Sequence, residues 1–127
     1  MEQDRIRVLS VDDHELVRQG LAMIINQESD MVFVSQASGG NEAIQQYREH
    51  RPNVTLMDLR MPDLSGIDAL LAIRAEFPDA CIIMLTTFES DVDVKRALEA
   101  GACAYLLKSI PPNELLQAIR QEHVRKK

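Results

Sequence analysis

Residues 6–13 read IRVLSVDD, a mainly apolar run that ends in two aspartates. Residues 54–59, VTLMDL, form a second run of this kind and place Asp58 near its end. Further runs rich in β-branched and aliphatic side chains occupy residues 31–34, 82–86 and 104–107. Three of the five runs, residues 31–34, 82–86 and 104–107, are continuously apolar apart from the final threonine of the second, a pattern typical of strands that are covered on both faces in a parallel sheet.

The segments between the runs have the periodicity of amphipathic helices. Apolar side chains recur at spacings of three and four between Leu16 and Ile25, as in a helix that packs on a sheet. Further helices are expected at residues 41–50, 67–75, 90–101 and from Pro111 onward. This strict alternation predicts a single α/β domain, (βα)5, with a doubly wound five-stranded parallel sheet. Five such strands suit the flavodoxin-like order 2-1-3-4-5.

Two of the predicted helices have recognisable stop signals. Pro52 disfavours the helical conformation in the preceding residue, Arg51, so that the second helix should end there. Gly101 is expected to close the fourth helix in a left-handed conformation.

The chain is short and acidic. Its 127 residues fit one domain, which we assign to residues 1–121, with residues 122–127 as the start of a linker or tail. A net charge of −6 opposes nonspecific attraction to nucleic acids and anionic membranes. No apolar run approaches the ~20 residues that span a bilayer, and the N-terminus has no signal-peptide pattern. We therefore expect a cytoplasmic protein without membrane contact.

The two cysteines give no sign of a metal site. Cys81 and Cys103 lie inside apolar runs, without CxxC spacing or clustered histidines. This arrangement disfavours zinc and a disulfide framework. We expect both to be small buried thiols.

Polar residues follow the predicted strands at one edge of the sheet. In such a fold, ligands bind beyond the carboxyl ends of the strands, where the strand order reverses. The residues at this edge are Asp12, Asp13, Asp58, Thr86 and Lys108. Each alone has an ordinary explanation, because aspartate suits turns and helix caps, threonine suits strands, and a lysine side chain can extend to solvent. Three converging carboxylates repel one another, so a divalent cation is indicated, and oxygen ligands favour Mg²⁺ or Mn²⁺ over zinc.

A magnesium site of this kind points to phosphoryl chemistry. Mg²⁺ held by few carboxylates keeps coordination positions for water and phosphate oxygens. Lys108 could neutralise a carboxylate or a transferred phosphoryl group, and the Thr86 hydroxyl could bond to a phosphoryl oxygen.

These residues resemble the receiver domain of two-component response regulators. The resemblance consists of the acidic pair, Asp58 followed by residues 59–62 (LRMP) and Gly66, then Thr86 and Lys108. It covers about residues 5–121, and the joint motif is highly specific. Residues 11–21, VDDHELVRQGL, are similar to the NarL/FixJ (LuxR-type) branch of that family.

The resemblance implies a role for each residue of the acidic site. Asp58 would be the phosphoacceptor for a phosphohistidine on a sensor histidine kinase. Asp13 would bind Mg²⁺ directly, Asp12 through water, and the backbone carbonyl of Arg60 would be a further ligand. Lys108 would pair with the Asp58 carboxylate before transfer and with the phosphoryl group afterwards. The chain would then be no enzyme but a phosphoacceptor domain that assists its own phosphorylation and dephosphorylation.

The resemblance also implies a conformational output. Thr86 and Tyr105 match the two switch positions, where the hydroxyl closes on the phosphoryl oxygen and the ring moves inward. The surface of the fourth helix, fifth strand and fifth helix would then control self-association as a homodimer. Transcription would be regulated through a DNA-binding domain absent from this chain, which ends too soon for a recognition helix. The alternative is a stand-alone regulator that acts by protein–protein contact.

Two positions near the site have no assigned role in this chemistry. Ser109 follows Lys108 where receivers often have a proline in a cis peptide bond, so the sequence leaves the conformation of that bond open. His14 neighbours the acidic pair, and we interpret it as part of the helix start rather than of the chemistry.

Two other functions compete with this interpretation. A haloacid-dehalogenase-type phosphohydrolase also uses an aspartyl phosphate and Mg²⁺, but it places a second acid two residues after the first, where this chain has Arg60. A flavin carrier would need a phosphate-binding loop after the first strand, and Asp12 and Asp13 are electrostatically wrong for one.

Overall fold

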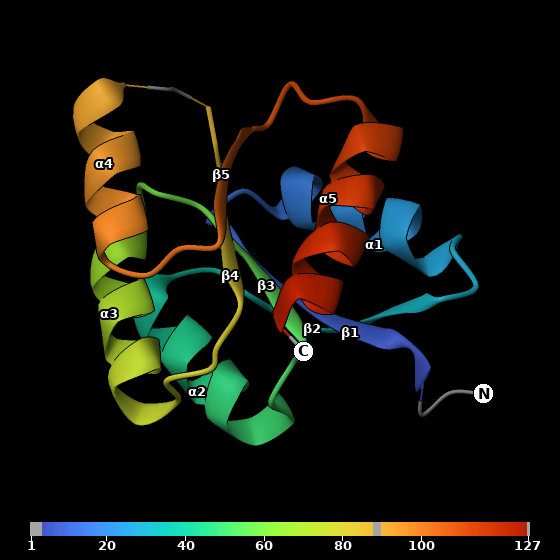
Figure 1. Ribbon diagram of the computed structural model, residues 1–127, viewed down its shortest axis with the longest axis horizontal. Helices are drawn as coiled ribbons and strands as arrows, with labels where there is room; N and C mark the ends of the chain where they lie inside the picture. The colour runs from blue at the N-terminus through green and yellow to red at the C-terminus, as the bar shows by residue number, and fades with distance from the viewer. Residues whose placement is uncertain (1–3, 88–89, 127) are drawn as a thin grey trace.

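Five parallel strands form a single sheet at the centre of the molecule (Figure 1). The computed structural model describes residues 4–87 and 90–126. The strands are β1 (Ile6–Val11), β2 (Met31–Ala37), β3 (Val54–Met57), β4 (Ile82–Thr86) and β5 (Ala104–Leu107). Their order, β2-β1-β3-β4-β5, confirms the predicted doubly wound arrangement.

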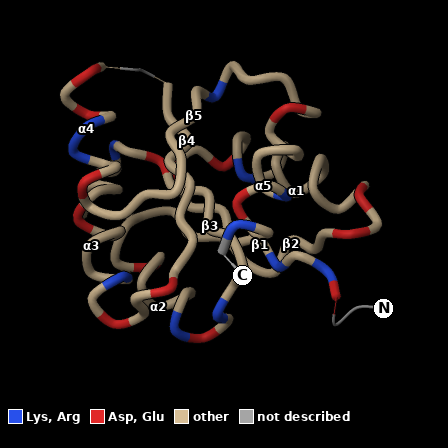
Figure 2. The backbone as a smooth tube through the Cα atoms, viewed as in Figure 1, with Lys and Arg blue, Asp and Glu red and all other residues tan. Residues whose placement is uncertain are grey.

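The helices cover both faces of this sheet. They are α1 (Glu15–Asn26), α2 (Gly40–His50), α3 (Gly66–Glu76), α4 (Asp91–Glu99) and α5 (Pro112–Lys126). On one face, α1 and α5 bury Ile25 and Ile119 against the sheet. On the other, α2, α3 and α4 bury Tyr47, Ile73 and Ala97. Figure 2 shows charged residues on the helices and loops, around an uncharged centre formed by β3, β4 and β5.

Both predicted helix stops are confirmed. Arg51 has φ 46° and ψ 60°, which is the left-handed conformation, and it follows directly after α2. Gly101 has φ 109° and follows the end of α4. Serine side chains begin two of the helices: Ser65 Oγ accepts from the Asp68 N–H, and Ser90 Oγ from the Asp93 N–H, both at 3.1 Å.

Two predicted strand ends are wrong. The strand β2 continues beyond Val34 to Ala37, because it lies at the edge of the sheet, where the side chains of Ser35 and Gln36 keep access to solvent. The strand β3 ends at Met57 rather than Leu59, because the chain turns at Asp58 and the Leu59 N–H bonds to the Asp58 side chain.

The last helix is longer than the sequence pattern indicated. It continues to Lys126, so that the predicted boundary between residues 121 and 122 falls inside α5. The assignment of residues 122–127 to a linker stays a prediction. Among the residues that the structure describes, no helix combines the length and apolar character needed to cross a membrane.

Candidate functional site

The predicted site residues lie at the carboxyl edge of the sheet. Asp12 follows β1, Asp58 follows β3, Thr86 ends β4 and Lys108 follows β5. Backbone hydrogen bonds between neighbouring strands fix these positions. The Asp58 N–H donates to the Val11 carbonyl at 2.9 Å, and the Lys108 N–H donates to the Thr86 carbonyl at 2.8 Å. The sheet topology therefore brings together side chains from four distant parts of the chain.

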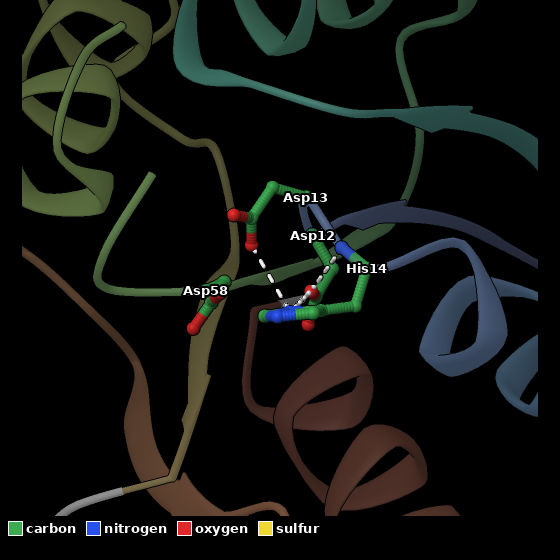
Figure 3. A group of neighbouring side chains, drawn as sticks. All are labelled: Asp12, Asp13, His14 and Asp58. Carbon is green, nitrogen blue, oxygen red and sulfur yellow. Dashed lines mark hydrogen bonds and ion pairs between the residues drawn. The ribbon is translucent and has the colours of Figure 1, made fainter. Parts of the chain in front are cut away.

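The acidic residues converge with a histidine (Figure 3). Asp12, Asp13, His14 and Asp58 each offer one ligand atom, and these atoms all lie within 4.8 Å of one another. Asp12 and Asp58 are buried, at 2% and 5% exposure, whereas Asp13 and His14 are exposed. The cluster thus has a buried floor and an open side from which a small ion or a phosphoryl group could enter.

Lys108 bridges the two buried carboxylates. Its Nζ lies 2.5 Å from Asp12 Oδ2 and 3.4 Å from Asp58 Oδ2, and its side chain is 17% exposed. The shorter contact is with Asp12, although the family resemblance implies a pair with Asp58. Since both acids lie within reach of one ammonium group, this single positive charge is shared by two negative ones.

The environment of Asp58 disfavours its ionised form. Burial raises the pKa of its carboxyl above the ordinary value, and the charge of Asp12 raises it further. Lys108 opposes this rise, as does the Leu59 N–H, which donates to Asp58 Oδ1 at 2.9 Å. The remaining repulsion between the carboxylates is of the kind that a bound cation would relieve.

His14 has a larger part in the cluster than its sequence position indicated. It begins α1, as expected, and its N–H donates to Asp12 Oδ1 at 2.9 Å. Its Nδ1 also lies 3.0 Å from Asp12 Oδ1 and 3.1 Å from Asp13 Oδ1. Its position directly after Asp12 and Asp13 in the sequence could have predicted these contacts with the two carboxylates.

The remaining predicted residues surround this centre. Thr86 is buried at the end of β4, and Tyr105 is half-buried on β5, packed against the core beneath α2, α3 and α4. The Arg60 side chain extends away to Asp93 at the start of α4, with 3.4 Å between Nη2 and Oδ2. The Lys108–Ser109 peptide bond is trans.

One supporting residue was missed by the sequence analysis. Asp63, in the loop after β3, accepts hydrogen bonds from the Gly40 and Asn41 N–H groups, both at 3.0 Å. These hydrogen bonds lower the pKa of its carboxyl and attach the loop that follows Asp58 to the start of α2. No motif marked Asp63, because its partners lie more than twenty residues away.

Comparison with known proteins identifies the family. Residues 8–120 match the response regulator receiver domain. The chain is 42% identical over 120 residues to the uncharacterized transcriptional regulatory protein YxjL of Bacillus subtilis, covering 94% of this chain and 55% of that protein. It is 40% identical over 116 residues to the response regulator protein VraR of Staphylococcus aureus, covering 91% and 56%. The chain thus spans about half the length of these relatives.

Solved structures agree with this result. A LuxR-family two-component response regulator from Aurantimonas sp. SI85-9A1 superimposes with a TM-score of 0.90 at 36% identity, covering 94% of this chain and 86% of that one. The signal receiver domain of the putative response regulator NarL from Mycobacterium tuberculosis gives 0.90 at 28% identity, covering 94% and 97%. This chain therefore belongs to the response regulator receiver domain family, and its relatives are LuxR-family response regulators.

Proposed function

We propose that this chain is a phosphorylation-controlled switch in which Asp58 accepts a phosphoryl group from a phosphohistidine of a sensor histidine kinase. One observation carries the proposal: Asp58 lies at the floor of an acidic cluster, and Lys108 contacts it from β5. A carboxylate nucleophile and a cation for the phosphoryl charge are the groups that this reaction requires.

In the proposed transfer, a carboxylate oxygen of Asp58 attacks the phosphorus while the bond from phosphorus to the kinase histidine breaks. The hydrogen bond from the Leu59 N–H orients the Asp58 carboxylate for attack. Lys108, already 3.4 Å from this carboxylate, neutralises charge on the phosphoryl oxygens. The Thr86 hydroxyl, on the neighbouring strand, then bonds to one of these oxygens.

The oxygen-rich cluster fits a magnesium ion, for which Mn²⁺ could substitute. Asp13, Asp58 and the backbone carbonyl of Arg60 would hold it directly, and Asp12 would act through water. The contacts of the two acids support this division, because Asp12 is buried and bound by Lys108 and the backbone N–H of His14, whereas Asp13 is exposed. When bound, Mg²⁺ neutralises negative charge on the phosphoryl oxygens.

The output would lie on the surface formed by α4, β5 and α5. Bonding to the phosphoryl group would draw the Thr86 side chain inward, and the ring of Tyr105 on β5 would move into the space that Thr86 vacates. This change would promote homodimerisation and control a DNA-binding domain in the remaining half of a longer protein. That protein would be a cytoplasmic transcription regulator and not an enzyme. The relative YxjL is named a transcriptional regulatory protein, which supports an output in transcription. The alternative is a stand-alone regulator acting by protein–protein contact.

Intact-mass measurement after incubation with acetyl phosphate and Mg²⁺ tests the proposal. We expect one added phosphoryl group in the wild-type chain and none in Asp58→Asn. Asp68→Asn is a matched control, because Asp68 lies exposed at the start of α3, and it should react like the wild type. Undiminished modification of Asp58→Asn, or equal rates in excess EDTA, would overturn the assignment.

A further inference from the structure

The two cysteines lie together at the amino edge of the sheet, opposite the acidic cluster. Cys81 directly precedes β4, and Cys103 directly precedes β5. The Cys103 N–H donates to the Ile82 carbonyl at 2.9 Å, which holds the two strand starts side by side. The two sulfur atoms are 3.1 Å apart, and both cysteines are thiols.

This geometry is close to that of a disulfide. Extending the register of β4 and β5 places Cys103 opposite Ile82, so Cys81 and Cys103 are offset by one residue on neighbouring strands. With strands about 4.8 Å apart and a rise of about 3.3 Å per residue, their Cα atoms should lie about 6 Å apart, within the range that a disulfide accepts. Bond formation would shorten the distance of 3.1 Å between the sulfur atoms by about 1 Å. The ring closed by such a bond would span residues 81–103, which include β4 and α4.

The two thiols differ in exposure and acidity. Cys81 is buried at 2% exposure, whereas Cys103 is half-buried. Both line a cavity of about 380 Å³, together with Arg74, Glu122 and Arg125. Hydrogen bonding to Cys81 lowers the pKa of Cys103 to about 7, against the opposing effect of burial. A cysteine with this pKa is substantially thiolate at neutral pH, and the thiolate is the reactive form.

We propose that Cys81 and Cys103 are an oxidation site, at which a peroxide converts the two thiols into an intramolecular disulfide. The Cys103 thiolate attacks one peroxide oxygen, the O–O bond breaks, and the leaving hydroxide takes up a proton to become water. The Cys81 sulfur then attacks the sulfur of the Cys103 sulfenic acid, and the S–O bond breaks. A second water leaves with the Cys81 proton, so that two thiols are oxidised and one peroxide is reduced.

Treatment of the chain with stoichiometric hydrogen peroxide tests this site by mass spectrometry. We expect loss of two hydrogen atoms, no alkylation by N-ethylmaleimide, a crosslink between the peptides containing Cys81 and Cys103, and reversal by dithiothreitol. The chain has two cysteines, so any other disulfide must join two molecules. A covalent dimer, or full alkylation at both positions after treatment, would overturn the proposal.

Single variants separate the roles of the two thiols. Cys81→Ala should stop at a Cys103 sulfenic acid that dimedone traps, whereas Cys103→Ser should give no such adduct at the same peroxide concentration. In the wild type, iodoacetamide should alkylate Cys103 with a half-maximal rate near pH 7, on the order of tenfold faster at that pH than an ordinary thiol. In Cys81→Ala this midpoint should move upward, with circular dichroism confirming the fold. An unmoved midpoint, or equal dimedone labelling of both variants, would show that Cys81 does not activate Cys103.

Discussion

Gly66, the first residue of α3, packs directly against the backbone of Asp58. A Cβ atom at position 66 would lie 2.0 Å from the Asp58 carbonyl oxygen and 2.9 Å from its carbonyl carbon. The Gly66 N–H also donates to the Leu59 carbonyl at 2.7 Å. The loop after β3 therefore brings the start of α3 into direct contact with the backbone of the proposed acceptor. Glycine, which has no Cβ atom, fits at position 66 without a clash.

We expect Gly66→Ala to lower the free energy of unfolding by about 1–3 kcal/mol, because the new methyl group meets backbone atoms that cannot move aside cheaply. Gly20→Ala is a matched control within α1, where no atom beyond the adjacent residues and the helix's own backbone lies within 4 Å of the added Cβ. This control should gain about 0.5–1 kcal/mol from reduced backbone entropy. Urea unfolding of both variants measures the difference, and equal stabilities would contradict the packing argument.

Asp58→Asn should stabilise the metal-free chain at neutral pH. Burial and the charge of Asp12 raise the pKa of Asp58, so ionisation of Asp58 opposes folding as pH rises through its folded-state pKa. Below the unfolded value of about 3.8, both forms of the protein carry an uncharged side chain at position 58, and the advantage of the variant should disappear. Urea titrations in EDTA from pH 3 to pH 7 test this sign. A gain that is constant with pH would show that charge is not its cause.

We expect Asp13→Ala to weaken Mg²⁺ binding more than Asp12→Ala does. Asp13 is exposed and near the other acids, whereas Asp12 already has Lys108 at 2.5 Å. Removal of a direct ligand costs more than removal of a group that acts through water. Isothermal titration with MgCl₂ measures both affinities, and the reverse order would exchange the roles of the two aspartates.

Lys108→Ala should keep the fold but impair the response to phosphorylation. Its ammonium group contacts both Asp12 and Asp58, so that its loss removes the link between the acceptor and β5. Amide NMR spectra with and without beryllofluoride report this response at α4, β5 and α5. Spectral changes equal to those of the wild type would show that Lys108 acts only as a local counterion.

Arg120→Ala should destabilise the chain by about 1 kcal/mol, because Arg120 joins α5 to the segment before β2. It lies 2.7 Å from both Glu28 Oε1 and Asp30 Oδ2. Hydrogen bonding to Arg120 lowers the pKa of Asp30, so this contribution is present above the unfolded value of about 3.8 and is lost as pH falls through the folded one.

Arg48→Ala provides the comparison, since Arg48 pairs with Glu76 in an exposed position. Its loss should cost less than that of Arg120, because Arg48 has one carboxylate partner instead of two. Thermal unfolding at pH 7 and pH 3 ranks the two variants, and an equal cost at both pH values would argue against an ionic origin.

The sequence pattern was sufficient for the strand order and for the edge at which the polar residues meet. Alternation of strands and helices determines at which edge of the sheet each strand ends, so the sequence alone places Asp12, Asp58 and Lys108 together. The close approach of Cys81 to Cys103 could not, because it depends on how β4 and β5 align, and apolar runs do not specify this register. The length of β2 was missed because Ser35 and Gln36 interrupt the apolar run, whereas an edge strand can carry polar side chains that reach solvent.

The strands β4 and β5 carry the thiols at one end and Thr86 and Lys108 at the other. Thermodynamic linkage then imposes a reciprocity between the two ends. If disulfide formation changes the free energy of phosphoryl binding by a given amount, phosphoryl binding changes the free energy of disulfide formation by the same amount. The midpoint potential of the cysteine pair can be measured with and without beryllofluoride, and the difference between the two values gives the coupling energy along these strands. Equal potentials mean that the two ends are energetically independent.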